Sequence, residues 1–160
     1  MSEKGNLGYN LAATFGDYLL EVPQHIGVCP SLDAAVKVLI AGYSSFRLNN
    51  DSMNVSVARE YAQALLRLRE DVDTFTGANL PLIIAAVMLL ALHEVYHFLC
   101  PISSARLTIP YQNMDGTIKT GWMAHAGGAS RLIKNARFDP WESPLARQLM
   151  INARGILVSV

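Results

Sequence analysis

The 160-residue sequence has little charge and few cysteines. Charged residues make up 16% of the chain and the formal net charge is zero, so basic residues are not in excess. Because a phosphate-binding surface usually shows such an excess, direct binding to nucleic acid is not expected. Cys29 and Cys100 lie far apart and without CxxC spacing, which also argues against a disulfide framework and a cysteine zinc site.

The sequence also lacks the apolar segment of a signal peptide near its N-terminus. Its most apolar run, from Leu80 to Leu92, is shorter than the roughly 18 residues that a membrane span needs. We therefore expect an intracellular protein of the cytoplasm or nucleus, with no membrane span. Its two cysteines are expected to be reduced and buried.

No stretch of useful length alternates apolar and polar residues as a strand does, whereas apolar residues recur every three or four positions. This period predicts one all-α domain over residues 1–160, with about six helices in antiparallel pairs. Prolines and the turn signal NMDGT predict a long loop over residues 101–120. The helices are expected at about residues 7–20, 31–46, 55–75, 79–100, 122–135 and 143–160.

Several local features of these helices can be predicted. The fourth helix is apolar nearly all round and should therefore be central. Ser31 and Ser143 are expected to cap the second and the last helix. Gly127 and Gly128 lie inside the fifth helix, where they predict close packing against another helix. The buried face of the second helix should carry Leu32, Ala35, Val36, Leu39 and Ile40.

The stretch LLALHEVYHFLC, residues 89–100 of the central helix, contains the pattern His-Glu-x-x-His. His93 and His97 share a helix face, so they could bind one zinc ion while Glu94 activates a metal-bound water. A catalytic zinc needs a third protein ligand, and no downstream residue stands at a spacing that the pattern requires. We therefore expect no metal and no cofactor, and a zinc hydrolase ranks last among the interpretations.

Without a metal, the end of the central helix carries groups that can move protons or bind a ligand by hydrogen bonds. These candidate catalytic residues are His93, Glu94, Tyr96 and His97. The candidate ligand-binding residues on the following helix are Trp122, His125 and Arg131. In the structural alternative, the histidines bond to neighbouring groups, and Glu94 pairs with Arg131, a loop amide or a tyrosine hydroxyl.

The order of four motifs resembles the regulatory (middle homology) domain of fungal-specific transcription factors, which carry a binuclear zinc cluster. The motifs are YAQALLRLREDV, IIAAVMLLALHEVYHFL, GWMAHAGGASRLI and SPLARQLMINARGILV. With CPSLDAAVKVLIAGY, which fits an earlier helix of the family, the resemblance covers about residues 20–160. The family's six-cysteine DNA-binding cluster has no counterpart in this sequence, so the resemblance implies a shortened regulatory domain without a DNA-binding module.

The resemblance implies a stand-alone domain that binds an apolar small molecule or a partner protein in fungal secondary metabolism. The alternative is a cofactor-free enzyme on the same scaffold, such as a cyclase, an isomerase or a Diels–Alder-type pericyclase. Its apolar pocket would lie beside residues 93–97 and would act by preorganising the substrate. The apolar C-terminal stretch ARGILVSV further predicts a homodimer formed through the last helix.

Overall fold

The computed structural model describes the backbone of residues 16–48, 51–99, 121–136 and 138–157, and the side chains of residues 16–45, 55–95, 124–136 and 138–152. Within these residues the chain forms α-helices and short 3-10 helices, and it contains no strand, so the all-α prediction is confirmed. The elements are α2 (Tyr18–Glu21), η2 (Val22–His25), α3 (Pro30–Leu48), α4 (Asp51–Asp73), η3 (Gly77–Asn79), α5 (Leu80–Leu99), α6 (Gly121–Asn135) and α7 (Pro144–Leu157).

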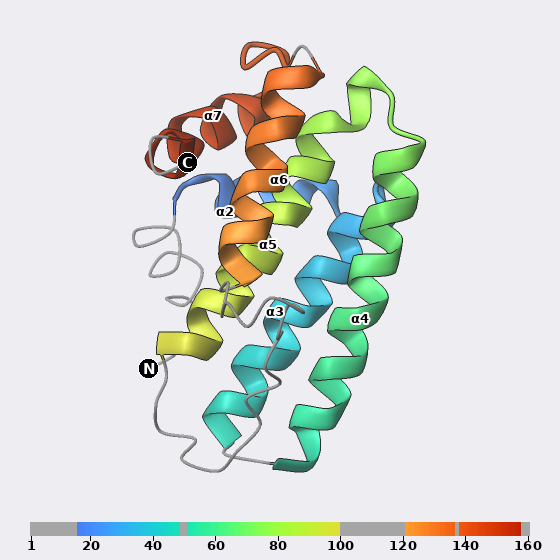
Figure 1. Cartoon of the computed structure of the whole chain (residues 1–160), viewed down its shortest axis with the longest axis vertical. Helices are drawn as coiled ribbons and strands as arrows, with labels where there is room; N and C mark the ends of the chain where they lie inside the picture. Colours follow the sequence, from blue (N-terminus) through green and yellow to red (C-terminus); the bar gives the residue numbers. More distant parts are fainter. Residues whose placement is uncertain (1–15, 49–50, 100–120, 137, 158–160) are drawn as a thin grey trace, which may run out of the picture.

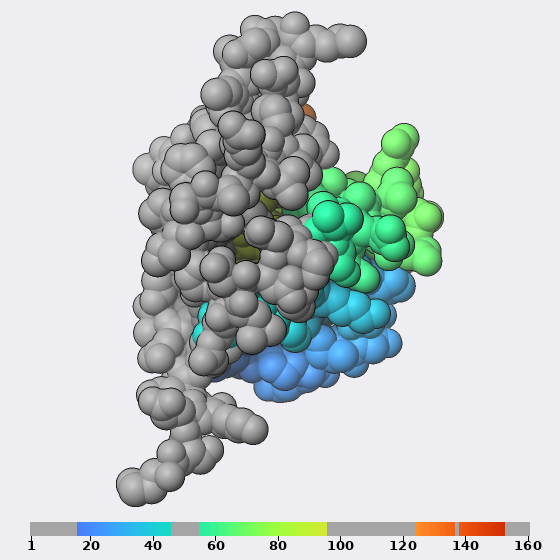
Figure 2. Space-filling model, turned by 90° about the horizontal axis from the view of Figure 1, so that it is seen from below, coloured from blue at the N-terminus to red at the C-terminus, as the bar shows by residue number. Residues whose placement is uncertain are grey.

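Antiparallel helices form the body of the fold. α3 packs along both α4 and α5, and α6 packs along α5. Figure 1 shows α3 and α4 as one long antiparallel pair, with α5 and α6 running in opposite directions beside them. α7 crosses one end of these helices, where it contacts α2, α5 and α6. Seen from below in Figure 2, α4 lies directly against α3.

The central position of α5 agrees with its sequence. Every residue from Leu80 to His93 is buried, on all sides of the helix, because other helices surround this stretch. A helix that is hydrophobic all round needs such an environment. Burial ends at Glu94 and Val95, which are partly exposed, so the polar end of α5 lies at the margin of the core.

With the short helix before it, α5 forms a 19-residue stretch, Gly77–Val95, that is long and apolar enough to cross a membrane. The expectation that the apolar run is too short for a span therefore does not hold for the whole helix. Within the fold, 78% of this stretch is buried, which is also what the core helix of a globular domain shows. The segments Tyr18–His25 and Pro30–Ser45 are long and apolar enough to span a membrane only when taken together. They are bent by 119° where they meet.

α3 begins one residue earlier than predicted, at Pro30, so Ser31 is not its N-cap. The backbone N–H of Ser31 instead donates to the carboxylate of Asp71, which reaches across from α4. The turn before the helix uses Gly27, whose φ of 86° lies in the left-handed region that favours glycine. The backbone N–H of Gly27 donates to Asp33 Oδ1 at 2.9 Å, which fixes this turn against the first turn of α3.

The predicted buried face of α3 is correct in part. Leu32 and Ala35 are buried, but Ile40 is 61% exposed and Val38 is fully buried in its place. Val38 continues the spacing of three from Leu32 and Ala35, whereas Ile40 lies on the opposite side of the helix. At the other end of the chain, the predicted cap of α7 is confirmed, because the backbone N–H of Ala146 donates to Ser143 Oγ at 3.1 Å.

Candidate functional site

Polar side chains from α4, α5 and α6 come together at the margin of the core. α4 and α6 run in one direction and α5 runs in the other (Figure 1), so the first half of α4 and of α6 lies beside the second half of α5. Tyr61 of α4, Glu94 of α5 and His125 of α6 meet there. We call these three residues the Tyr–Glu–His cluster.

Hydrogen bonds link all three members of the cluster. The Tyr61 hydroxyl donates to Glu94 Oε1, and it lies 2.8 Å from His125 Nε2. His125 Nε2 is also 3.2 Å from Glu94 Oε1. Tyr61 has one hydroxyl proton, which goes to Glu94, so the contact with His125 requires a proton on Nε2. The resulting order of donors is His125 to Tyr61 to Glu94.

The second carboxylate oxygen of Glu94 has no such partner. Oε2 is buried and accepts no hydrogen bond from the described part of the chain, although the Glu94 side chain as a whole is 20% exposed. An unsatisfied buried acceptor typically costs about 1–3 kcal/mol, and more for a charged group. The cluster therefore carries one acceptor that the described residues leave unused.

His93 lies directly beside the cluster. Its side chain is buried, and the centres of the His93 and Tyr61 rings are 5.7 Å apart. On its other side the ring presses on α3 at Gly42, where a Cβ atom would lie 2.6 Å from His93 Cε1. Only a residue without a side chain allows the ring this close to the α3 backbone. His93 thus fills the space between α3 and Tyr61 and limits the positions that the Tyr61 ring can take.

Apolar side chains line the cluster on the side of the bundle interior. Ala64, Leu90 and Ala129 lie three or four positions from Tyr61, Glu94 and His125 along their own helices, and all three are buried. Because residues at this spacing share a helix face, they form an apolar layer next to the cluster. The arrangement therefore combines a few convergent polar groups with an apolar layer next to them.

The structure brings together three of the predicted site residues: His93, Glu94 and His125. Arg131 is exposed, six residues beyond His125 and on another face of α6, so it is not a member of the cluster. Of the three pairings proposed for Glu94, the tyrosine hydroxyl is the one found among the described residues. The predicted residues whose side chains lie outside the described residues are Tyr96, His97 and Trp122.

Among the described residues, no group of three His, Cys, Asp or Glu side chains could hold a metal ion. His97, the second histidine of the His-Glu-x-x-His pattern, lies outside that set. Of the pattern's described residues, Glu94 binds Tyr61 and His125, and His93 packs against Gly42. Nothing in these contacts supports the zinc alternative.

Sequence reasoning missed Tyr61, because it stands at helical spacing with Ala58 and Leu65 on the apolar stripe of α4. The side chain does lie on that stripe, but its hydroxyl ends in the cluster. A partly buried tyrosine usually finds a hydrogen-bond partner for its hydroxyl. That rule indicates that Tyr61 needs a polar neighbour, although it does not say which helix supplies it.

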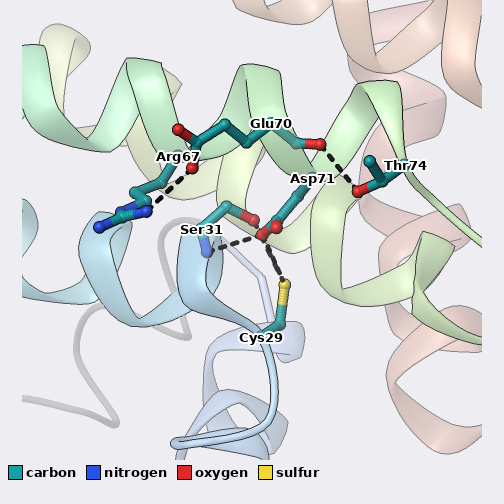
Figure 3. Close-up of polar contacts among 6 residues, drawn as sticks. All are labelled: Cys29, Ser31, Arg67, Glu70, Asp71 and Thr74. Carbon is teal, nitrogen blue, oxygen red and sulfur yellow. Dashed lines mark hydrogen bonds and ion pairs between the residues drawn. The ribbon is translucent and has the colours of Figure 1, made fainter.

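A second polar cluster lies at the opposite end of α3, where Figure 3 shows Asp71 reaching from α4 toward Cys29 and Ser31. Asp71 Oδ2 accepts hydrogen bonds from the Ser31 backbone N–H at 2.9 Å and from Cys29 Sγ at 3.4 Å. Burial raises the pKa of the Cys29 thiol above its ordinary value, and the nearby Asp71 adds to this shift. A protonated thiol suits a donor role and not that of a nucleophile.

The hollow beside this second cluster is small. It has a volume of about 50 Å³ and is lined in part by Phe75, Asn79 and Ile83. Pockets that bind organic ligands are typically about 300 Å³ or larger. We therefore interpret the contacts of Asp71 as a helix cap supplied by a neighbouring helix.

The close helix packing predicted at Gly127 and Gly128 is absent from the described contacts. A Cβ atom built at either position meets no heavy atom within 4 Å. A glycine that does lie against another element is Gly42, where the ring of His93 leaves no room for a Cβ atom. The prediction failed because a pair of glycines in a helix does not specify which face of the helix is covered.

Comparison with protein-family models, curated proteins and solved structures finds no match to this chain. The resemblance to fungal-specific transcription factors therefore rests on the order of the sequence motifs, and it stays a prediction.

Proposed function

We propose that this chain is a helical domain that binds a small molecule at the Tyr–Glu–His cluster and acts as a regulatory, transcription-factor-like protein in fungal secondary metabolism. The observation that carries the binding proposal is Glu94 Oε2, which is buried and has no partner among the described residues. The regulatory part of the proposal rests on the motif order described above.

A purely structural network explains this geometry less well. Buried polar groups in native proteins are nearly always hydrogen-bonded, because an unpaired group loses its bonds to water and gains nothing in return. Here side chains of three helices meet at one carboxylate, yet the described residues use one of its two oxygens and leave the other without a partner. A ligand that donates to Oε2 would complete the network and would stabilise the arrangement of all three helices.

Ligand-observed NMR on a library of small compounds tests this proposal. We expect a set of ligands to bind the wild-type protein and to bind the Glu94→Gln variant much more weakly. Asp71→Asn is the matched control, because Asp71 is also a partly buried carboxylate but lies at the other end of α3. The proposal is wrong if no compound binds, or if the two variants weaken the same ligands equally.

The second candidate function is a cofactor-free enzyme of the isomerase or cyclase type. The observation that favours it is the chain of donors from His125 through Tyr61 to Glu94, because such a chain can pass protons between groups. In an isomerisation, one member of the chain would remove a proton from a substrate carbon and another would return a proton elsewhere, with no net change in protons.

Exchange of deuterium from solvent tests this second function. We expect the wild-type protein to accelerate incorporation of deuterium next to the carbonyl of cyclohexanone, and Tyr61→Phe to abolish the acceleration. An equal rate with and without the protein would refute a proton-transfer role for the cluster and would leave the binding proposal unaffected.

A further inference from the structure

A row of side chains on the outside of α7 is left exposed by the described residues. Trp141 precedes the helix and is 74% exposed, and Ile151 within it is 55% exposed. Pro144 and Arg147 are exposed between them. Positions 144, 147 and 151 share one face of the helix, because they are three and four residues apart. We call Trp141, Pro144, Arg147 and Ile151 the α7 strip.

The indole ring of Trp141 is held in place although it is exposed. The Trp141 backbone N–H donates to Asp139 Oδ1 at 2.8 Å, and the N–H of Glu142 donates to the carbonyl oxygen of Asp139 at 3.3 Å. The Arg147 guanidinium lies over the indole ring, 5.3 Å from its centre, and makes no ion pair with the described residues. A ring that is already ordered loses little conformational entropy when another surface packs on it, which suits Trp141 to a contact.

The chain passes directly beside the α7 strip before it enters α2. A Cβ atom at Gly16 would overlap with the side-chain amide of Asn152, so the backbone at Gly16 lies against α7. Asn152 follows Ile151 and is partly exposed, at the edge of the exposed face of the helix. Residues 1–15 lie outside the described residues, and they therefore join the structure at the end of the strip that carries Ile151.

Gly16 also interrupts the first helix that the sequence predicts, at about residues 7–20. Its φ of 117° is positive, which favours glycine and differs from the φ of a helix. The described helix α2 begins only at Tyr18. Glycine with a positive φ commonly follows the last residue of a helix. The backbone at Gly16 thus suits a separate helix that ends at residue 15.

The sequence before Gly16 has an apolar face that fits the strip. Leu7, Leu11 and Phe15 stand four residues apart, so in a helix they share one face. A helix over residues 6–15 is about 15 Å long, at 1.5 Å per residue, which is close to the reach from Trp141 to Ile151. Glu3 stands four residues before Leu7 and supplies a carboxylate for the unpaired guanidinium on the strip.

We propose that residues 6–15 form a helix that lies along the α7 strip, with Leu7, Leu11 and Phe15 facing it. The helix runs in the same direction as α7, because it must end where Gly16 meets Asn152. The contact involves none of the residues of the Tyr–Glu–His cluster and does not depend on ligand binding there. It covers the strip from within one chain, so the strip is not free for the homodimer that the sequence predicts through the last helix.

Fluorine NMR of the full chain labelled with 5-fluorotryptophan measures how far Trp141 is covered. The chain has two tryptophans, and Trp141→Phe identifies the signal of Trp141. The shift of this signal between H2O and D2O, divided by that of free 5-fluorotryptophan, reports the exposure of the ring. Without a cover the ratio should be close to the exposed fraction of 74%. We expect a markedly lower ratio in the wild-type chain.

Two triple variants locate the cover. Leu7→Ser, Leu11→Ser and Phe15→Ser together should raise the ratio to the uncovered value, because they remove the apolar side chains that face the strip. Asn6→Ser, Tyr9→Ser and Ala13→Ser together change the opposite face of the same helix and should leave the wild-type ratio unchanged. Circular dichroism checks that both variants retain their helices, and if the first does not fold, Leu11→Ser and Ala13→Ser replace the two triples.

The outcomes decide between this cover and the alternatives. A low wild-type ratio that rises in the first variant and not in the second supports the proposal. A wild-type ratio near 74% means that the strip is open, and it overturns the proposal. The proposal is also overturned if the two variants act alike, or if the ratio falls as protein concentration rises, since a second copy would then be the cover.

Discussion

Removing the Asp71 carboxylate should destabilise the fold through α3, the helix that it caps from α4. In Asp71→Ala the backbone N–H of Ser31 and the thiol of Cys29 lose the acceptor that lies 2.9 Å and 3.4 Å away. Ser31 and Cys29 are 1% and 3% exposed, so water can replace the carboxylate only in part. Figure 3 shows this carboxylate of α4 reaching the start of α3.

The magnitude follows from two effects. Loss of an N-cap acceptor costs about 0.5–2 kcal/mol, and leaving a buried donor unsatisfied costs about 1–3 kcal/mol. These effects overlap, because both describe the Ser31 N–H, so we expect a fall of about 2 kcal/mol in the free energy of unfolding. In a chain of this size that fall lowers the melting temperature by about 4–8 °C.

Urea unfolding followed by circular dichroism measures this change, and Asp73→Ala is the control. Asp73 lies two residues further on α4, and its pair with Arg69 is 4.0 Å long and largely exposed. Exposed pairs of this kind contribute little, so the control should unfold almost as the wild type does. Equal midpoints for Asp71→Ala and Asp73→Ala would refute the idea that Asp71 caps α3.

Three further predictions concern packing and pH. Gly42→Ala should destabilise the protein by about 1–3 kcal/mol, because the added methyl group overpacks against the ring of His93. The penalty should disappear in a His93→Ala background. Equal penalties in both backgrounds, measured by urea unfolding, would contradict the contact between Gly42 and His93. Gly128→Ala should stabilise the protein by about 0.5–1 kcal/mol, because the position is open and helical, and a lower melting temperature would show that the position is covered. Burial raises the pKa of Tyr18 far above its ordinary value of 10.0, so unfolding releases a proton above that pH and stability should fall as pH rises beyond it. Tyr18→Phe should lessen this fall by up to about 1.4 kcal/mol per pH unit. The free energy of unfolding is measured at several values between pH 10 and 11, and the same dependence on pH in the wild type and the variant would be inconsistent with the raised pKa.

Local sequence patterns accounted for most of the helices. The ends of α5 and α6 agree with the predicted ranges to within a residue or two, and the serine at the start of α7 caps it as expected. These features depend on residues that are close together in the chain. The composition of α5, which is apolar on all sides, likewise predicted that other elements surround it, although it did not indicate which ones.

The candidate site was predicted only in part. The sequence pointed to His93 and Glu94 because of their spacing pattern and their place at the end of a very apolar helix. It did not connect them with Tyr61, which is 33 residues away from Glu94 and reads as one more large side chain in an apolar stripe. It also grouped Arg131 with His125, although the turn of α6 places these two on different faces.

The sequence by itself determined the helical class, the approximate extents of α3, α5 and α6 and the central place of α5, because periodicity and capping act over a few neighbouring residues. Tertiary structure alone decided which distant groups meet. Packing set Asp71 on the start of α3, pressed His93 against Gly42, and left one oxygen of Glu94 without a partner among the described residues. These outcomes depend on how the helices are aligned and rotated against one another, and no single helix encodes that relation.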